Sequence, residues 1–261
     1  MELNNLTDEE KPPLIINAYI VTYFPNVDLL CSLINSVLKQ GVALVYVFDN
    51  TDDINTANKI KILCENLGSK YINKGQNIGL SKAYNFLLKE YPCDWALLLD
   101  QDTTLGNDYV QVFKEILGSL HKPDKVIRIG AEGYYILDVF KLKYIWTFFC
   151  QNTGTFLNVK LFNKVGEFDE DLFMYHVDVE HCLRSWRNGY RVLCSPYLYC
   201  FHNMSITTFS TSAPLKSRNI FKKDITLFIK KYKFIYPIAT IISIVLSSIS
   251  SLLKLKINLW N

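Results

Sequence analysis

The chain has 261 residues, of which 49% are hydrophobic and 20% are charged, and its formal net charge is +3. This length and composition predict a globular protein with a large core and exclude a disordered chain, while the low net charge disfavours nucleic-acid binding. Seven scattered cysteines without a CxxC pair indicate core thiols rather than disulfides or a zinc cluster. The N-terminus is polar and acidic, unlike a signal peptide, so we expect a cytoplasmic protein.

Apolar runs and amphipathic stretches alternate over the first hundred residues. The runs predict strands, and the helical spacing of apolar residues between them predicts helices that end near Gly41 and Gly68. The expected elements, in chain order, are a strand over Leu14–Tyr23, a helix over Val27–Leu38, a strand over Ala43–Phe48, a helix over Ile54–Leu67, a strand over Lys70–Ile72, a helix over Leu80–Leu88 and a strand over Trp95–Leu99. The alternation predicts right-handed βαβ units and an α/β fold with a mainly parallel, Rossmann-like sheet flanked by helices.

After residue 105 the pattern becomes mixed. The expected elements are a helix over Asp108–Leu117, strands over Lys125–Leu137 and Tyr144–Phe149, a strand and a short helical turn within GTFLNVKLFNKVG, a helix over Val177–Asn188 and one or two strands over Arg191–Phe201. We expect a smaller mixed sheet packed on the first half, not a second βαβ domain.

Residues 234–253, FIYPIATIISIVLSSISSLL, form an uncharged stretch between lysine clusters. Its length just suffices to cross a hydrocarbon core of about 30 Å as a helix, although Pro237 and the serines weaken that interpretation. A helix in the membrane interface, with lysines toward anionic head groups, fits as well, and a packing helix is the structural alternative. We favour surface association of a hydrophobic helical tail, residues 221–261, with the inner face of the cell membrane.

Two carboxylates directly follow the last strand of the first half, in DWALLLDQDTT. Open α/β sheets bind ligands at the carboxyl ends of their strands, where Asp49, Asn50, Asp100 and Asp102 are expected. Alternation along an extended segment would place Asp100 and Asp102 on one side and Gln101 on the other. Such a pair suits Mg²⁺ or Mn²⁺, since a cation relieves the repulsion between carboxylates. A cap on the following helix is the structural alternative.

Further polar features lie elsewhere along the chain. The loop 75–79, GQNIG, leads into a helix N-terminus suited to an anion or a sugar edge, without a Walker A or GxGxxG pattern. Asp178 and Glu180 lie near the start of an expected helix, but residues two apart on a helix point to different sides. We therefore assign the site-facing position to Asp178 and expect Glu180 to pair with Arg184 one turn later. His202 follows the aromatic strand VLCSPYLYCF, where a core or surface role is the commoner one.

Several segments in this order resemble the family 2 inverting glycosyltransferases, which share the GT-A fold, and most closely their bacterial rhamnosyltransferase branch. The segments are AYIVTYFP, VFDN, NKGQNIGLSKAYN, DWALLLDQDT, QNTGTFLNVKLFNKVGEFDEDLFMYHVDVEHCLR and CFHN. The resemblance covers roughly residues 15–220. It implies a glycosyltransferase domain over residues 1–220, with a nucleotide-sugar half over about 14–105 and an acceptor half over about 106–220, ahead of the tail.

The resemblance also implies roles for individual residues. The residues that would hold the sugar nucleotide are Thr22, Asp49, Asn77 and Asp100. The residues that would hold a metal ion, Mg²⁺ or Mn²⁺, are Asp102, Asp100 and His202. The residues expected on the acceptor side are Gly154, Thr155 and Glu180. Asp178 falls where the family carries its catalytic base. The chain departs from the family pattern at His181 and Cys182, where an aromatic residue is frequent, and this bears on acceptor preference.

The activity implied by the resemblance is sugar transfer from a dTDP- or UDP-linked donor to a saccharide or lipid-linked saccharide, in bacterial surface polysaccharide synthesis. Rhamnose is favoured as the sugar, with galactofuranose, glucose and galactose open. Two other classes remain: a metal-dependent nucleotidyltransferase and a non-catalytic membrane adaptor that keeps the fold. The first would usually carry a basic, glycine-rich loop early in the chain, and the second would not need acids at all the expected positions.

Overall fold

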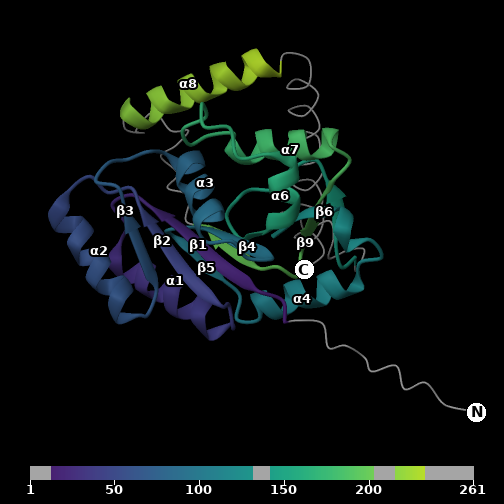
Figure 1. Ribbon diagram of the computed structural model, residues 1–261, viewed down its shortest axis with the longest axis horizontal. Helices are drawn as coiled ribbons and strands as arrows, with labels where there is room; N and C mark the ends of the chain where they lie inside the picture. Colours follow the sequence, from purple (N-terminus) through teal and green to yellow (C-terminus); the bar gives the residue numbers. More distant parts are fainter. Residues whose placement is uncertain (1–12, 132–141, 203–214, 233–261) are drawn as a thin grey trace, which may run out of the picture.

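A mixed eight-stranded sheet organises the residues that the computed structural model describes, which are 13–131, 142–202 and 215–232 (Figure 1). Its strand order is β3-β2-β1-β4-β8-β6-β9-β7, and a separate two-stranded sheet pairs β10 with β5. The strands are β1 (Ile16–Thr22), β2 (Leu44–Asp49), β3 (Lys70–Asn73), β4 (Trp95–Asp100), β5 (Thr103–Leu105), β6 (Val126–Ala131), β7 (Ile145–Thr147), β8 (Thr155–Asn158), β9 (Arg191–Ser195) and β10 (Cys200–His202). The helices are α1 (Val27–Lys39), α2 (Ile54–Asn66), α3 (Leu80–Glu90), α4 (Tyr109–Ser119), α6 (Val159–Val165), α7 (Val177–Arg187) and α8 (Leu215–Lys231).

The first four strands are parallel, as the alternation of strands and helices predicts. Every residue of β1 is buried, because helices cover both faces of the sheet. Local signals set the helix starts: the side chain of Asn26 accepts hydrogen bonds from the first amides of α1, and that of Asp53 accepts one from Thr56 of α2. All seven elements expected here are present, with ends shifted by a few residues.

Antiparallel pairing begins at β8, which lies between β4 and β6. The mixed strands therefore extend the first sheet instead of standing apart as a smaller sheet, because β8 hydrogen-bonds directly to the edge of β4. β9 is parallel to β6, and β7 is antiparallel to β9. The expected strand over Lys125–Leu137 is described only to Ala131, since residues 132–141 lie outside the described ranges.

Two apolar layers sandwich the sheet. One contains buried residues of α1, α2 and α4, and the other contains buried residues of α3, α6, α7 and α8, including Tyr84, Phe162 and Phe228. All seven cysteines carry free thiols, and Cys64, Cys150, Cys182 and Cys194 are buried, as expected for core thiols.

The helix α8 crosses above α7 in Figure 1. Asp224 and Phe228 of this helix are buried, so α8 packs on the domain, and the expected boundary at residues 220 and 221 falls within it. Within the described ranges, none of the helices combines the length and the apolar character that a membrane span requires. The uncharged stretch 234–253 lies outside the described residues.

Candidate active site at the strand ends

Asp49 ends β2, and its carboxylate is wholly buried. Oδ1 accepts hydrogen bonds from the Thr22 hydroxyl at 2.9 Å and from the Thr51 amide at 3.0 Å. Oδ2 accepts from the Tyr71 hydroxyl at 2.9 Å and, more weakly, from Asn73 Nδ2 at 3.4 Å. Burial and the adjacent Asp49 carboxylate raise the pKa of Tyr71. The structure thus brings Asp49 and Thr22 together, as a network that fixes the ends of β1, β2 and β3.

The loop 73–79 is held against β2 by short side chains. Asn50 Oδ1 accepts from the Ile78 amide at 3.1 Å, and Asn77 Oδ1 accepts from the Gly79 amide at 3.0 Å. Gly79 has φ 89°, and a Cβ there would lie 2.7 Å from the Phe173 carbonyl oxygen, so only glycine fits. The side chain of Asn77, a residue expected in the nucleotide pocket, stabilises the turn that leads into α3 through its hydrogen bond with Gly79.

Asp100 and Asp102 lie at the end of β4, but the chain turns at residues 101 and 102 before β5 begins. The prediction of one continuous extended segment is therefore wrong. The Thr103 hydroxyl donates to the Asp100 carbonyl oxygen at 2.8 Å within this turn, and the Tyr23 amide donates to Gln101 Oε1 at 2.7 Å. The alternative of a helix cap also fails, because α4 begins at Tyr109, seven positions after Asp102, and its N-cap is Asp108.

Backbone pairing brings His202 to the same turn. In the antiparallel register of β5 and β10, His202 lies opposite Thr103, the residue after Asp102. The paired residues of the two strands are 95 to 99 positions apart in the sequence, so this proximity comes only from the fold. Within the described ranges, no cluster of three or more His, Cys, Asp or Glu side chains is arranged to hold a metal ion.

The segment 150–155 lies beside Asp100. The Thr153 hydroxyl donates a short hydrogen bond to Asp100 Oδ2, and the Gly154 amide donates to the Leu98 carbonyl oxygen at 2.9 Å. Gly154 has φ 72°, and a Cβ there would lie 2.7 Å from both Cys200 Sγ and the Tyr109 hydroxyl. Thr155 is wholly buried, and its hydroxyl donates to the Gln151 carbonyl oxygen. Thr155, one of the two residues expected on the acceptor side, is therefore part of the buried support of this segment.

Asp178 lies in the first turn of α7, as predicted, and is half-buried. Its Oδ1 accepts from the Val179 amide at 2.8 Å. The buried Tyr84 hydroxyl donates to the Leu99 carbonyl oxygen at 3.1 Å, directly before Asp100. Burial raises the pKa of Tyr84 well above its usual value, and the charges of Asp100 and Asp178 raise it further. Tyr84 therefore fixes the backbone at the end of β4.

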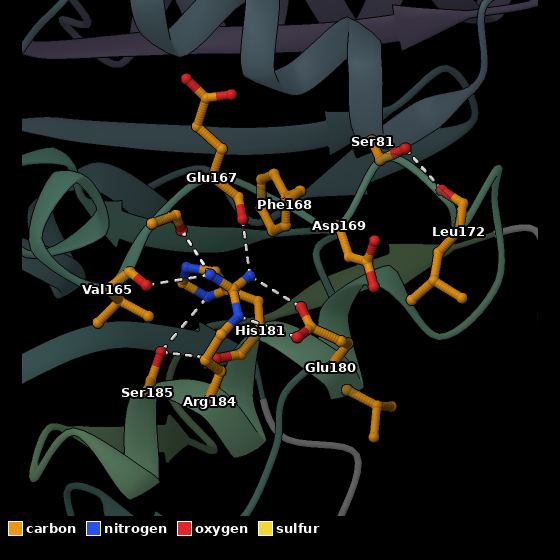
Figure 2. Close-up of polar contacts among 12 residues, drawn as sticks. Ser81, Val165, Glu167, Phe168, Asp169, Leu172, Glu180, His181, Arg184 and Ser185 are labelled. Carbon is orange, nitrogen blue, oxygen red and sulfur yellow. Dashed lines mark hydrogen bonds and ion pairs between the residues drawn. The ribbon is translucent and has the colours of Figure 1, made fainter. Parts of the chain in front are cut away.

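Glu180 pairs with Arg184, as the helical spacing predicts (Figure 2). Glu180 is 3% exposed, and Arg184 binds it with two hydrogen bonds, from Nε to Oε1 at 2.9 Å and from Nη2 to Oε2 at 2.8 Å. The Tyr232 hydroxyl donates to Oε1 at 2.6 Å. Arg184 also donates to the carbonyl oxygens of residues 165, 166 and 167. Glu180 therefore anchors α7 within the fold.

His181 and Cys182 are both wholly buried, so neither of them contacts an acceptor directly. Arg128, also fully buried, donates from Nε to His181 Nδ1 at 3.3 Å and from Nη1 to Asn152 Oδ1 at 2.8 Å. Since a guanidinium only donates, the neutral imidazole carries its proton on Nε2. Burial, with smaller effects of Arg128 and Arg184, lowers the pKa of His181 well below its usual value. This network lies under the segment that holds Asp100.

Sequence reasoning missed four residues that shape this site: Tyr84, Arg128, Thr153 and Asp224. Thr153 and Tyr84 could have been noticed, since QNTG and AYN both lie within segments of the family resemblance. The other two lie on elements whose apolar spacing gives no reason to single out a polar residue. Two surface hollows, of about 680 and 780 Å³, are lined by residues other than the candidate site residues.

Comparison with known proteins gives a consistent assignment. The model of the family described as "Glycosyl transferase family 2" matches residues 18–184. A curated relative, the dTDP-rhamnosyl transferase RfbF of Shigella flexneri, is 25% identical over an alignment of 214 residues that covers 72% of this chain and 68% of the relative.

Similar solved structures include the mannosyltransferase PcManGT from Pyrobaculum calidifontis in complex with GDP-Man and Mn²⁺, with a TM-score of 0.59 and 16% identity over 72% of this chain. S. aureus TarS has a TM-score of 0.55 and 15% identity over 83% of this chain. The chain spans only 56% and 44% of these two solved chains. At such identities the likeness shows the fold alone, which is the GT-A arrangement.

Proposed function

The chain belongs to glycosyl transferase family 2, and we propose that it transfers a sugar, with rhamnose favoured, from a nucleoside diphosphate donor to a saccharide or lipid-linked saccharide. The similarity to a dTDP-rhamnosyl transferase supports a dTDP-linked donor, with a UDP-linked donor as the alternative. The observation that carries the proposal is that Asp100, held by Thr153 at the end of a parallel strand, and Asp178, at a helix start, both lie within the residues that the family model matches.

Asp178 is the proposed catalytic base. As an acceptor hydroxyl attacks the anomeric carbon, the Asp178 carboxylate takes its proton, and the nucleoside diphosphate leaves from the opposite face of the sugar. One displacement inverts the anomeric configuration and leaves no sugar on the protein. The first turn of α7 suits this role, because the positive end of a helix favours the ionised carboxylate that can accept a proton.

Two carboxylates suit a Mg²⁺ or Mn²⁺ ion. Asp100 and Asp102 offer hard oxygen ligands at one turn, and these ions keep several waters or phosphate oxygens beside one or two carboxylates. When bound, the ion would neutralise charge that develops on the departing diphosphate. The proposed ligands are Asp102 and Asp100, with His202 as a third from the paired strand β10. Thr153 holds Asp100 in place through its hydroxyl.

The remaining donor contacts are proposed for the ends of β1 and β2. Thr22 and Asp49 form the wall against which the base or ribose would lie, and Asn77 lines the loop on the other side. The four hydrogen bonds that Asp49 already accepts hold the ends of these strands in place, so its part in donor binding would be to shape this wall. The acceptor sugar would lie over Gly154, with Thr155 and Glu180 supporting that side from within the protein.

Association with the inner face of the cell membrane is proposed for residues 221–261. The exposed lysines Lys222, Lys223 and Lys230 of α8 support contact with anionic head groups. A chain truncated after Tyr232 keeps these lysines but lacks the uncharged stretch, so it should bind anionic vesicles more weakly while it keeps nucleotide binding. Vesicle binding that is unchanged by the truncation would remove the proposed role of the tail.

The test of the function is a panel of sugar nucleotides, linked to dTDP, UDP and GDP, assayed for nucleoside diphosphate release with and without saccharide acceptors. We expect release that depends on the sugar and is stimulated by an acceptor. Pyrophosphate formation from a nucleoside triphosphate and a sugar phosphate would instead indicate the nucleotidyltransferase. Binding of nucleotides without any turnover would indicate the non-catalytic adaptor.

A further inference from the structure

A buried carboxylate on α8 binds the loop that leads to the proposed base. Asp224 is wholly buried, and its Oδ1 accepts a hydrogen bond from the Phe173 amide at 3.1 Å. Its Oδ2 accepts from the amides of Met174 and Tyr175 at 2.8 and 2.9 Å. Three consecutive amides thus share one carboxylate that lies about fifty positions later in the sequence. Hydrogen bonds to an ionised acceptor are stronger than those between neutral groups.

The loop needs this support because its backbone is irregular. His176, directly before α7, has φ 63°, a left-handed conformation that is unfavourable for a residue with a Cβ. Burial lowers the pKa of His176, while the charges of Asp178 and Asp224 oppose that shift. A residue with a strained backbone persists only where its surroundings hold it in place. Asp224 does this for His176 by binding the amides of residues 173–175, which directly precede it.

Other contacts join α8 to the same loop and to α7. The Tyr175 and Ser217 hydroxyls lie 2.9 Å apart, and the His176 ring stacks on Phe228 with a centroid distance of 5.1 Å. Beyond α8, Tyr232 donates to Glu180. The helix therefore contacts the loop and α7 along its length, with Asp224 at the centre of the contact.

The opposite side of the loop contacts the donor side of the site. The Leu80 amide donates to the Phe173 carbonyl oxygen at 2.7 Å, and the Ser81 hydroxyl donates to the Leu172 carbonyl oxygen at 2.6 Å (Figure 2). The loop is thus bound by the start of α3 on one side and by Asp224 on the other. A shift of the loop would move the start of α7 relative to the donor side.

We propose that Asp224 is a positioning residue for sugar transfer, which holds residues 173–175 so that Asp178 faces the acceptor hydroxyl. This proposal rests on the proposed function. Asp224 touches no reacting atom; it acts through the loop. A misplacement of about 1 Å at a reacting group can cost about a hundredfold in rate. Asp224 keeps the loop before α7 in place, and its loss should therefore lower kcat.

The experiment compares Asp224→Asn with a matched control, Asp171→Asn. The first variant replaces Oδ2, which accepts hydrogen bonds from two amides, with a group that donates. The second removes an exposed carboxylate that pairs with Lys231 at 3.1 Å. We expect Asp224→Asn to lower kcat at least about tenfold, with the donor KM within about threefold, because Asn50 still holds the donor loop. The control should keep both parameters within about twofold. An unchanged kcat in folded Asp224→Asn would overturn the proposal.

A second measurement is independent of activity. Hydrogen exchange of the amides of residues 173–175 should accelerate at least about tenfold in Asp224→Asn and stay unchanged in Asp171→Asn, and equal exchange in both variants would overturn the proposal. If Asp224→Asn does not fold, Tyr175→Phe removes only the bond to Ser217 and should lower kcat about two- to fivefold, with the donor KM unchanged. An unaltered kcat there would overturn it. A wild-type protein that transfers no sugar, yet shows the expected exchange pattern, would refute the proposed function and leave the hold on the loop established.

Discussion

The proposed donor side and the proposed base side of the site are held in different ways. On the donor side, Asp49 is fixed by residues from its own strand end and from the two neighbouring strands. On the base side, Glu180 and the loop 173–175 are fixed by residues about fifty positions later, Tyr232 and Asp224. The donor geometry therefore follows from the parallel sheet itself, whereas the base geometry depends on one helix added late in the chain.

This difference predicts which substitutions affect chemistry and which affect folding. Asp102→Asn, at the half-buried turn after β4, should cut turnover at least about a hundredfold, the scale expected when one group that stabilises the transition state is lost. Its melting temperature should stay close to that of the wild type, because asparagine keeps the size and the polarity of the side chain. Steady-state kinetics with added Mg²⁺ or Mn²⁺, alongside thermal unfolding, check both halves of the prediction.

Removal of the metal is the control for that substitution. Excess EDTA should lower wild-type turnover to a similar extent, and added Mn²⁺ should restore it. Full activity in excess EDTA would show that the two carboxylates at this turn do not act through a cation.

On the base side, the larger effect should be on stability. Glu180→Gln should lower the free energy of unfolding by about 2–4 kcal/mol, because it breaks a buried pair that Tyr232 also joins. Lys61 and Glu65 form a pair of the same spacing on α2, at 3.8 Å and exposed on both partners. Glu65→Gln is therefore the matched control and should change the free energy of unfolding by less than about 0.5 kcal/mol. Urea unfolding of both variants measures the difference, and equal values would contradict the contrast between buried and exposed pairs.

The smallest expected effect concerns pH. The pKa of His181 is lowered in the folded protein, so the unfolded chain binds more protons below its usual pKa of about 6.5. The stability that neutral His181 contributes is therefore present above that pH and is lost as the pH falls. We expect a loss of about 1–2 kcal/mol between pH 7.5 and 5.5, and the partly buried His176 adds a loss of the same sign.

A variant separates the two histidines. His181→Asn keeps an acceptor near Arg128 but cannot take up the proton, so the pH dependence of its unfolding free energy should be weaker than that of the wild type. Urea unfolding at the two pH values measures this. An identical slope in both proteins would assign the effect to other groups.

The sequence predicted the donor side far better than the base side. The strands and helices up to Asp100 follow from apolar periodicity, and their carboxyl ends meet because parallel strands share an edge. The turn at residues 101 and 102 was missed, since β5 has only three residues and pairs with β10, about a hundred positions away. The sequence singles out Asp49 because the apolar run before it clearly predicts a strand that ends there. Its four hydrogen-bond partners come from the ends of three strands, and only the fold reveals them.

On the base side, the helix α7 and the Glu180–Arg184 pair were predicted from spacing within one helix, which is local information. The buried Arg128 could not be predicted, because a strand with VIRIGA gives no sign that the guanidinium points inward to His181. Asp224 is similar: it lies in a lysine-rich helix that was assigned to the tail, and only the three amides that it binds reveal its burial.

The central claim is that Asp178, and not Glu180, acts as the base. A direct test compares sugar transfer by Asp178→Asn and Glu180→Gln at a temperature where both are folded, together with their affinities for the donor. The account predicts that Asp178→Asn loses at least about a thousandfold in kcat while its donor affinity stays within a few-fold, since the base acts only in the transition state. Glu180→Gln should keep kcat within about tenfold. If Asp178→Asn transfers sugar at close to the wild-type rate while Glu180→Gln is inactive, the wrong carboxylate has been assigned and the account is contradicted.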